Sequence, residues 1–238
     1  MHRKLNILRL VIAVVLAILL FSFTNMRNEK RNLAKLEIKF TDGQPPFITY
    51  PMVNKLLIQN EETITSITKE KLVLNTLENV LNKNQMIQDA QVYMTVNGQL
   101  EARINQRKPI ARIEGVDSYY LDSEGKKMPL SPVFSARVPL ITGVVNENTL
   151  EALYGLADYI VKDDFLLKNI TGIHSGEKNM ILSVRTYDFK IGLGKVEKLE
   201  TKFRNFKAFY QKALKDGTLN NYKVVSLKFD NQVVCTKK

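Results

Sequence analysis

Residues 90–104 read AQVYMTVNGQLEARI and contain the clearest short-range pattern in the chain. Apolar and polar residues alternate on both sides of an Asn-Gly pair at 97–98, which predicts two antiparallel strands joined by a tight turn. A two-residue loop would place Met94 opposite Glu101, whereas a loop one residue longer places Met94 opposite Leu100. We favour the longer loop because it keeps the apolar side chains on one face of the hairpin.

The segments before this hairpin complete a first module over residues 33–105. Alternation in residues 36–40 (LEIKF) predicts a strand. Pro51 suits the first turn of a helix, and residues 73–81 carry apolar side chains at the spacing of a second helix. The first module is therefore predicted to run strand–helix–helix–strand–strand.

Residues 106–238 predict a second, mainly β module. Short apolar stretches between Gly, Pro and Asp predict strands at residues 110–114, 119–122, 126–130, 138–141, 170–174, 180–185, 189–193, 222–229 and 232–236. Asn148 with Glu151 resembles a capping box at the start of one helix. A second helix starts near Lys195 and ends before Gly217. The predicted fold class is α+β, in which this module is a mixed, mainly antiparallel β domain with two helices.

Residues 10–26 predict a single transmembrane helix at the amino-terminal end. The stretch 10–23, LVIAVVLAILLFSF, is apolar apart from Ser22, and it approaches the ~20 residues that a membrane-spanning helix needs. A cleavable signal peptide is the alternative, although the small residues that cleavage requires are poorly represented. Residues 1–9 would form a short cytoplasmic tail. Basic residues flank the segment on both sides, so charge alone leaves the topology open.

The composition describes an ordinary globular chain with an excess of positive charge. Hydrophobic residues make up 45% and charged residues 25% of the 238 residues, and the net charge is +11. Such a surface suits nucleic acid, anionic lipid or an acidic partner, but no nucleic-acid-binding motif is present. The single cysteine, Cys235, excludes an internal disulfide.

Catalytic patterns are sparse. The two histidines are His2, before the apolar segment, and His174, and Cys235 has no histidine close in sequence. The acidic pair at 163–164 lacks further metal-ligand spacing, and no phosphate-binding glycine loop is present. We expect no enzymatic activity, no metal or other cofactor, and no small-molecule substrate.

Five segments of the second module follow one another in a recognisable order after the hairpin. They are QRKPIARI at 106–113, YLDSEG at 120–125, VPLITG at 138–143, IGLG at 191–194 and VSLKFDNQVV at 225–234. The series resembles the FtsQ/DivIB family of bacterial cell-division proteins in its Bacteroidota-like form, and the first module then corresponds to a POTRA-like domain. Two features depart from the family pattern. A polar insert at 41–49 replaces a compact turn, and no extended C-terminal tail follows the last predicted strand.

The resemblance implies a non-enzymatic scaffold of the divisome. Such proteins cross the cell inner membrane once, place the C-terminal domain in the periplasm at the division septum, and regulate septal peptidoglycan synthesis. The β domain binds FtsB and FtsL through an added strand at its terminal edge, while the POTRA domain and the membrane helix meet other divisome proteins. The candidate partner-binding residues are Lys228, Phe229, Asn231, Gln232, Val233 and Val234. The alternative for Phe229 and Val233, together with Leu227, is that they fill the core of the domain itself.

Two other functions stay open. One is a POTRA-containing envelope assembly or secretion component, although no series of later β-barrel strands is evident. The other is a membrane-tethered cell-wall hydrolase, for which the sequence offers no recognisable catalytic set.

Overall fold

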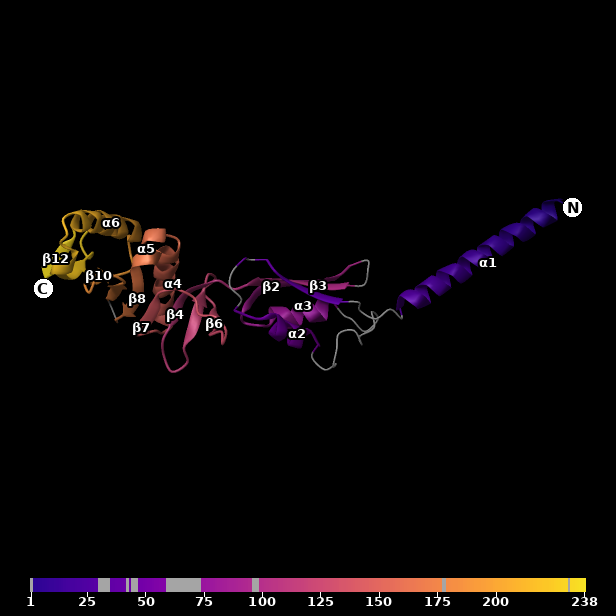
Figure 1. The fold of residues 1–238 in the computed structure, drawn as a ribbon, viewed down its shortest axis with the longest axis horizontal. Helices are drawn as coiled ribbons and strands as arrows, with labels where there is room; N and C mark the ends of the chain where they lie inside the picture. Colours follow the sequence, from indigo (N-terminus) through magenta and orange to yellow (C-terminus); the bar gives the residue numbers. More distant parts are fainter. Residues whose placement is uncertain are drawn as a thin grey trace. The chain divides into compact units, whose positions relative to one another are not determined.

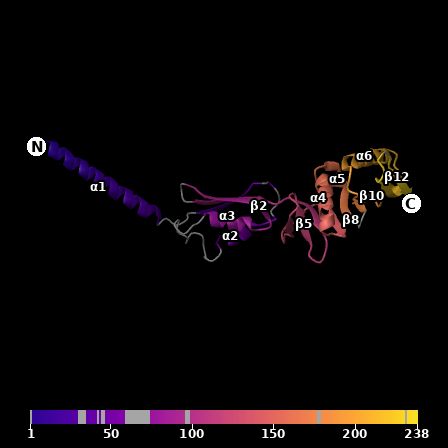
Figure 2. The same cartoon turned by 180° about the vertical axis from the view of Figure 1, so that it is seen from behind.

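The chain divides into two compact units, Met1–Gln106 and Arg107–Lys238, and each is described by itself (Figures 1 and 2). The computed structural model describes residues 2–29, 35–41, 43, 47–58, 74–95, 99–176, 179–230 and 232–238.

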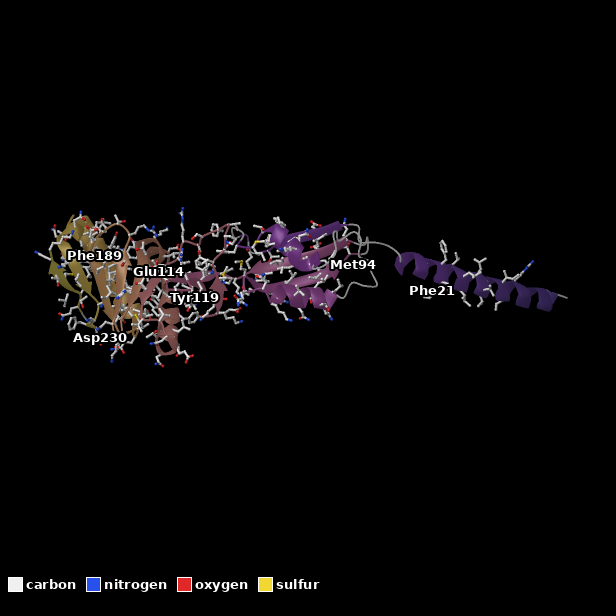
Figure 3. All side chains as sticks on the ribbon, turned by 90° about the horizontal axis from the view of Figure 1, so that it is seen from below. Phe21, Met94, Glu114, Tyr119, Phe189 and Asp230 are labelled. Carbon is white, nitrogen blue, oxygen red and sulfur yellow. The ribbon has the colours of Figure 1, made fainter. Side chains whose placement is uncertain are left out.

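Helix α1, His2–Glu29, contains the apolar segment near the amino terminus. The large apolar side chains that are described in this helix are exposed, among them Leu10 at 66% and Phe21 at 75%; Figure 3 labels Phe21. Among the described residues, no helix combines the length and the apolar composition that crossing a membrane requires. The anchor at residues 10–26 stays a prediction.

The rest of the first unit follows the predicted order of elements. These are β1 Lys35–Phe40, α2 Tyr50–Ile58, α3 Leu74–Asn82, β2 Ile87–Met94 and β3 Gln99–Gln106. In the sheet, β3 lies between β1, its parallel neighbour, and β2, its antiparallel neighbour. Met94 pairs with Leu100 and Val92 with Ala102, which confirms the register that the longer loop predicts. The loop itself, residues 96–98, lies outside the described residues.

The side chain of Gln106 ties the segment before α2 to the end of β3. It is fully buried, and its Oε1 accepts hydrogen bonds from the main-chain N–H groups of Phe47 (2.7 Å) and Ile48 (3.3 Å). Both of those side chains are buried as well. The polar insert predicted at 41–49 therefore ends in the core of the unit, although its residues 42 and 44–46 lie outside the described part.

The second unit is built on one nine-stranded sheet. Its strands are β4 Pro109–Ile113, β5 Tyr119–Asp122, β6 Lys127–Pro129, β7 Leu140–Gly143, β8 Ile170–Ser175, β9 Met180–Val184, β10 Lys190–Gly194, β11 Tyr222–Ser226 and β12 Val234–Lys237. Their order is β12-β11-β10-β9-β8-β7-β4-β5-β6. Five neighbouring pairs are antiparallel and three are parallel, so the prediction of a mixed, mainly antiparallel sheet is confirmed.

Three α-helices lie over one face of this sheet (Figures 1 and 2). They are α4 Glu147–Val161, α5 Asp164–Asn169 and α6 Leu199–Lys215, and a 3₁₀ turn, η3 Leu219–Asn221, follows α6. Between helices and sheet lies one apolar core that includes Leu153, Leu156 and Ile160 from α4, Phe203 and Phe206 from α6, and Ile173, Leu182, Ile191 and Val225 from the strands. Burial of this size is the main favourable contribution to folding of the unit.

Helix α4 begins two residues earlier than predicted. The N-cap is Asn146, and its side chain accepts from the N–H of Thr149 (3.1 Å), whose hydroxyl accepts from the N–H of Asn146 (3.0 Å). The capping box predicted from Asn148 and Glu151 is wrong, because the earlier asparagine finds a threonine that completes the same reciprocal pair.

Helix α5 was not predicted, and the count of two helices is therefore wrong. Asp163 caps α5 by accepting from the N–H groups of Phe165 (3.1 Å) and Leu166 (3.0 Å). Six residues are too few to show a helical repeat in the sequence.

Helix α6 begins at Leu199 and not near Lys195. Gly194 (φ +73°) and Lys198 (φ +52°) both have left-handed backbone conformations, so residues 194–198 form a turn before the helix. This turn, called here the 194–198 turn, lies beside the C-terminal strands.

Candidate partner-binding edge

Strand β12 is the last strand at one edge of the nine-stranded sheet. Within the described residues it pairs only with β11, and the N–H of Lys238 extends that pairing by donating to the carbonyl of Asn221 (2.9 Å). Main-chain groups alternate between the two sides of a strand. The N–H and C=O groups of Cys235 and Lys237 must therefore point away from β11, where a further strand could bond to them.

The side chains of β12 divide between the two faces of the sheet. Val234 is 42% exposed and Thr236 is exposed, both on the face away from the helices. Cys235 is half-buried and packs against the core, and this burial raises the pKa of its thiol. A raised pKa keeps the sulfur protonated at neutral pH, and Cys235 packs against the apolar core at this edge.

The opposite edge, β6, is better protected. It has only three residues, and one of them is Pro129, which has no N–H to donate. The Nζ atom of Lys127 lies over the ring of Tyr119, 4.9 Å from its centre. Both edge strands are short and both contain a lysine, but only β6 contains a proline, so β12 offers the more complete row of main-chain groups to a further strand.

Most of the predicted partner-binding residues do not lie on a strand. Strand β11 was predicted to extend to residue 229 and β12 to begin at 232, but β11 ends at Ser226 and β12 begins at Val234. Both bounds are corrected because the pairing of β11 with β12 ends at Ser226 and Val234. Leu227 is buried, and its N–H donates to the carbonyl of Gly192 (2.9 Å), which continues the ladder with β10 and not the one with β12.

Residues 227–230 and 232–233 are the described part of the loop between the two strands, called here the 227–233 connection. It contains Lys228, Phe229, Gln232 and Val233, while Val234 is the first residue of β12. Asn231 lies outside the described residues. The structure therefore brings five of the six predicted residues together at one end of the edge, mostly in a loop.

Burial separates the two apolar residues of this connection. Phe229 is 49% exposed, whereas Val233 packs against the core together with the buried Leu227. The core interpretation thus holds for Leu227 and Val233, and Phe229 keeps the exposure that a contact residue needs.

The residues that fix the connection were not predicted from the sequence. Lys198 Nζ bonds to Asp230 Oδ2 (2.6 Å), and Asn205 Nδ2 donates to the carbonyl of Asp230 (3.1 Å); Figure 3 labels Asp230. A methyl group added at Gly194 would lie 3.0 Å from Cγ of Lys228, so the stem of Lys228 packs directly on this glycine. No periodic pattern links residues about thirty positions apart, so only the fold reveals these contacts.

Positive charge is concentrated around this edge. Residues 185–238 contain thirteen lysine and arginine residues and five aspartate and glutamate residues, a net +8. Residues 107–184 contain nine lysine and arginine residues and ten aspartate and glutamate residues, a net −1. The one acid of the connection, Asp230, is bound to Lys198. The field at this end of the unit therefore favours an acidic partner.

Groups suited to catalysis are dispersed in the second unit. The exposed His174 lies 3.1 Å from the hydroxyl of Thr142. Glu124, beside a cavity of about 300 Å³ at the start of α4, is bound to Arg107 (3.0 Å) and Lys126 (2.9 Å). In the part of the chain that the structure describes, no group of three or more His, Cys, Asp or Glu side chains could hold a metal ion.

Comparison with known proteins assigns both units. A family model described as FtsQ/DivIB, C-terminal related, matches residues 108–236, and a POTRA-like domain model matches residues 34–105. Among solved structures, a similar one is the major extracytoplasmic domain of the trans isomer of the cell-division protein DivIB from Geobacillus stearothermophilus. It is 13% identical with a TM-score of 0.35, over 47% of this chain and 95% of that one. No curated protein matches the chain.

Proposed function

The chain belongs to the FtsQ/DivIB family of bacterial cell-division proteins, and on that premise we propose that it is a non-enzymatic scaffold of the divisome. In this proposal residues 10–26 anchor it in the cell inner membrane, the two units lie in the periplasm at the septum, and it regulates septal peptidoglycan synthesis. It does so by binding FtsB and FtsL. The POTRA-like domain and the membrane helix contact other divisome proteins.

The observation that carries the proposal is the accessible β12 edge with exposed groups beside it. A partner segment that adds as a further strand of the sheet would bond to the outward main-chain groups of Cys235 and Lys237. Alternate side chains of that segment would meet Val234 on one face, while Phe229 and Lys228 would meet its end. Main-chain bonds supply affinity in this mode, and the side chains supply specificity.

Charge supports the same partner class. Lys228 is exposed, packs its stem on Gly194, and directly precedes the exposed Phe229 in the sequence. A segment with carboxylates flanking an apolar residue would complement that pair. Rim charges of this kind raise association rates and select partners more than they raise affinity.

The edge mechanism is tested by a proline at an outward-facing position. We would measure binding of the full chain to the cognate FtsB–FtsL pair by calorimetry, with Lys237→Pro and its matched control Lys237→Gln. Both variants remove the same charge, but only proline removes the outward N–H, and proline is tolerated where the N–H faces solvent. One lost hydrogen bond of about 1 kcal/mol predicts roughly fivefold weaker binding for proline than for glutamine.

The predicted contact residues are tested by a charge reversal with a truncation. Lys228→Glu with Phe229→Ala should abolish co-purification of the pair while the thermal transition of the domain stays unchanged. Binding that survives this double variant but is lost in Lys237→Pro would move the contact onto the strand. Failure of the folded wild-type chain to bind the pair would argue against the scaffold role, and cell-wall hydrolysis would then be assayed.

A further inference from the structure

Lys202 is a buried charged residue that the proposed function does not use. It lies on the inner face of α6, next to Phe203, and is only 5% exposed. Its Nζ donates to the carbonyls of Leu193 (3.1 Å) and Lys195 (2.7 Å). Among the described residues no carboxylate forms an ion pair with it, so main-chain oxygens alone hold this ammonium.

An apolar side chain at position 202 would fill the inner face of α6 without the free-energy cost of burying a charge. Removing an ammonium from water costs several kcal/mol unless good hydrogen bonds compensate, and burial lowers the pKa of Lys202 although Glu197 and Asp230 act in the opposite direction. Two carbonyls at the end of β10 would, however, lose their donor. The lysine therefore acts on the backbone of the 194–198 turn and not simply on the packing of α6.

That turn holds the 227–233 connection at two points. Lys198, its last residue, bonds to Asp230, and Gly194, its first, supports the stem of Lys228. Asn205, one turn along α6 from Lys202, binds the carbonyl of Asp230. A continuous series of contacts thus leads from the buried ammonium to the residues on either side of Phe229.

We propose that Lys202 is a positioning residue for the partner-binding edge: by fixing the 194–198 turn it holds the 227–233 connection, and with it Lys228 and Phe229, in the conformation that the partner meets. The inference rests on the proposed function. Pre-organisation of this kind increases affinity because less conformational entropy is lost on binding.

The test combines amide hydrogen exchange with binding to the FtsB–FtsL pair, both on the full chain. Lys202→Met removes the ammonium but keeps an unbranched side chain of similar length. Lys212→Met on the exposed side of the same helix is the matched control for loss of one lysine. The amide of Leu227, bonded to Gly192, reports on the connection. Lys202→Met should raise its exchange rate at least tenfold and weaken binding about tenfold, and Lys212→Met should change neither.

Unchanged exchange at Leu227 in a folded Lys202→Met variant would overturn the inference. Faster exchange with unchanged binding would overturn the role in recognition. If Lys202→Met does not fold, Lys198→Asn replaces it, because asparagine tolerates the left-handed conformation but cannot reach Asp230; it should produce the same two changes at smaller size. The exchange measurement needs no partner, so it decides the local role even if the wild-type chain fails to bind the pair.

Discussion

The middle of the nine-stranded sheet and its β12 end are stabilised in different ways. In the middle, Leu182, Ile191 and Leu193 have no exposed surface and lie under the helices. At the end, Phe229 and Val234 keep 49% and 42% of their surface, and the connection is held by polar contacts to Asp230 as well as by the core packing of Leu227 and Val233.

This difference separates stability from recognition. Apolar burial contributes about 25 cal/mol for each Å² removed from water, so the middle of the sheet carries most of the stability. Exposed ion pairs contribute only about 0–1 kcal/mol each. Substitutions in the middle should therefore unfold the unit, and substitutions at the end should change binding in a protein that stays folded.

The largest effect on stability is expected when phenylalanine is replaced by alanine in the core, and the same replacement at the β12 end provides the comparison. Phe206→Ala empties a fully buried position in α6 and should lower the free energy of unfolding by about 3–5 kcal/mol. Phe229→Ala removes the same atoms from a half-exposed position and should cost below about 1 kcal/mol. Urea unfolding of the two variants measures both. Equal losses would show that Phe229 belongs to the core and is not available to a partner.

A smaller effect on stability is expected at Gly143, where the last residue of β7 lies beside the last residue of β8 in the sheet. Gly143 has φ +91°, and a methyl group there would lie 2.3 Å from the carbonyl oxygen of Ser175, so the backbone must move. Gly217, after α6, has φ +66°, but a methyl group added there would have no other atom within 4 Å. Both alanine variants suffer the dihedral cost of about 1–3 kcal/mol, and only Gly143→Ala adds a collision. Thermal unfolding should therefore show a clearly lower Tm for Gly143→Ala than for Gly217→Ala.

The sequence predicted the fold best where a single periodic pattern decides it. The hairpin register, Met94 opposite Leu100, follows from alternation alone. Local capping was harder, because Asn146 and Asn148 both suit an N-cap and only the reciprocal hydroxyl of Thr149 distinguishes them. Helix α5 is shorter than two turns and leaves no periodic signal.

The edge position of the last segment was predicted, but its secondary structure was not. This segment forms the terminal strand of the sheet, yet the β11–β12 pairing ends at Ser226 and Val234, so residues expected on a strand form a loop. Lys202 was predictable in part: it lies at helical spacing with Leu199 and Phe206, so the periodicity alone places it on the inner face. Its carbonyl acceptors depend on the 194–198 turn, which no local rule predicts.

Acid stability should depend on Asp163, which joins α5 to α6. Burial disfavours its charged form, but the ammonium of Lys207 and the N–H groups of Leu166 and Phe165 outweigh this and lower the pKa of Asp163 below its usual 3.8. Its contribution is therefore complete above about pH 4 and is lost as the pH falls through the lowered value. Asp163→Ala should cost about 0.5–2 kcal/mol at pH 7 through the lost cap. Asp163→Asn keeps the cap and should therefore lower stability less than Asp163→Ala does. It should also flatten the acid-unfolding curve in the pH range where Asp163 titrates. A curve that stays the same as that of the wild-type chain would show that the ion pair with Lys207 contributes nothing.

The smallest effect on stability is expected at the edge itself, from Val234→Asp. Val234 is exposed, so a carboxylate there stays in water, and the unfolding free energy should change by about 0.5 kcal/mol or less. Val133→Asp places the same charge on a 56% exposed valine in the segment between β6 and β7 and serves as the matched control. A partner strand beside β12 would face the new carboxylate directly, and like charges or an apolar neighbour opposite it are unfavourable. Binding to the FtsB–FtsL pair should therefore weaken about tenfold for Val234→Asp and stay unchanged for Val133→Asp. If Val234→Asp instead unfolded the unit, the edge would be part of the stabilising core, and the division between a stabilising middle and a recognising end would not hold.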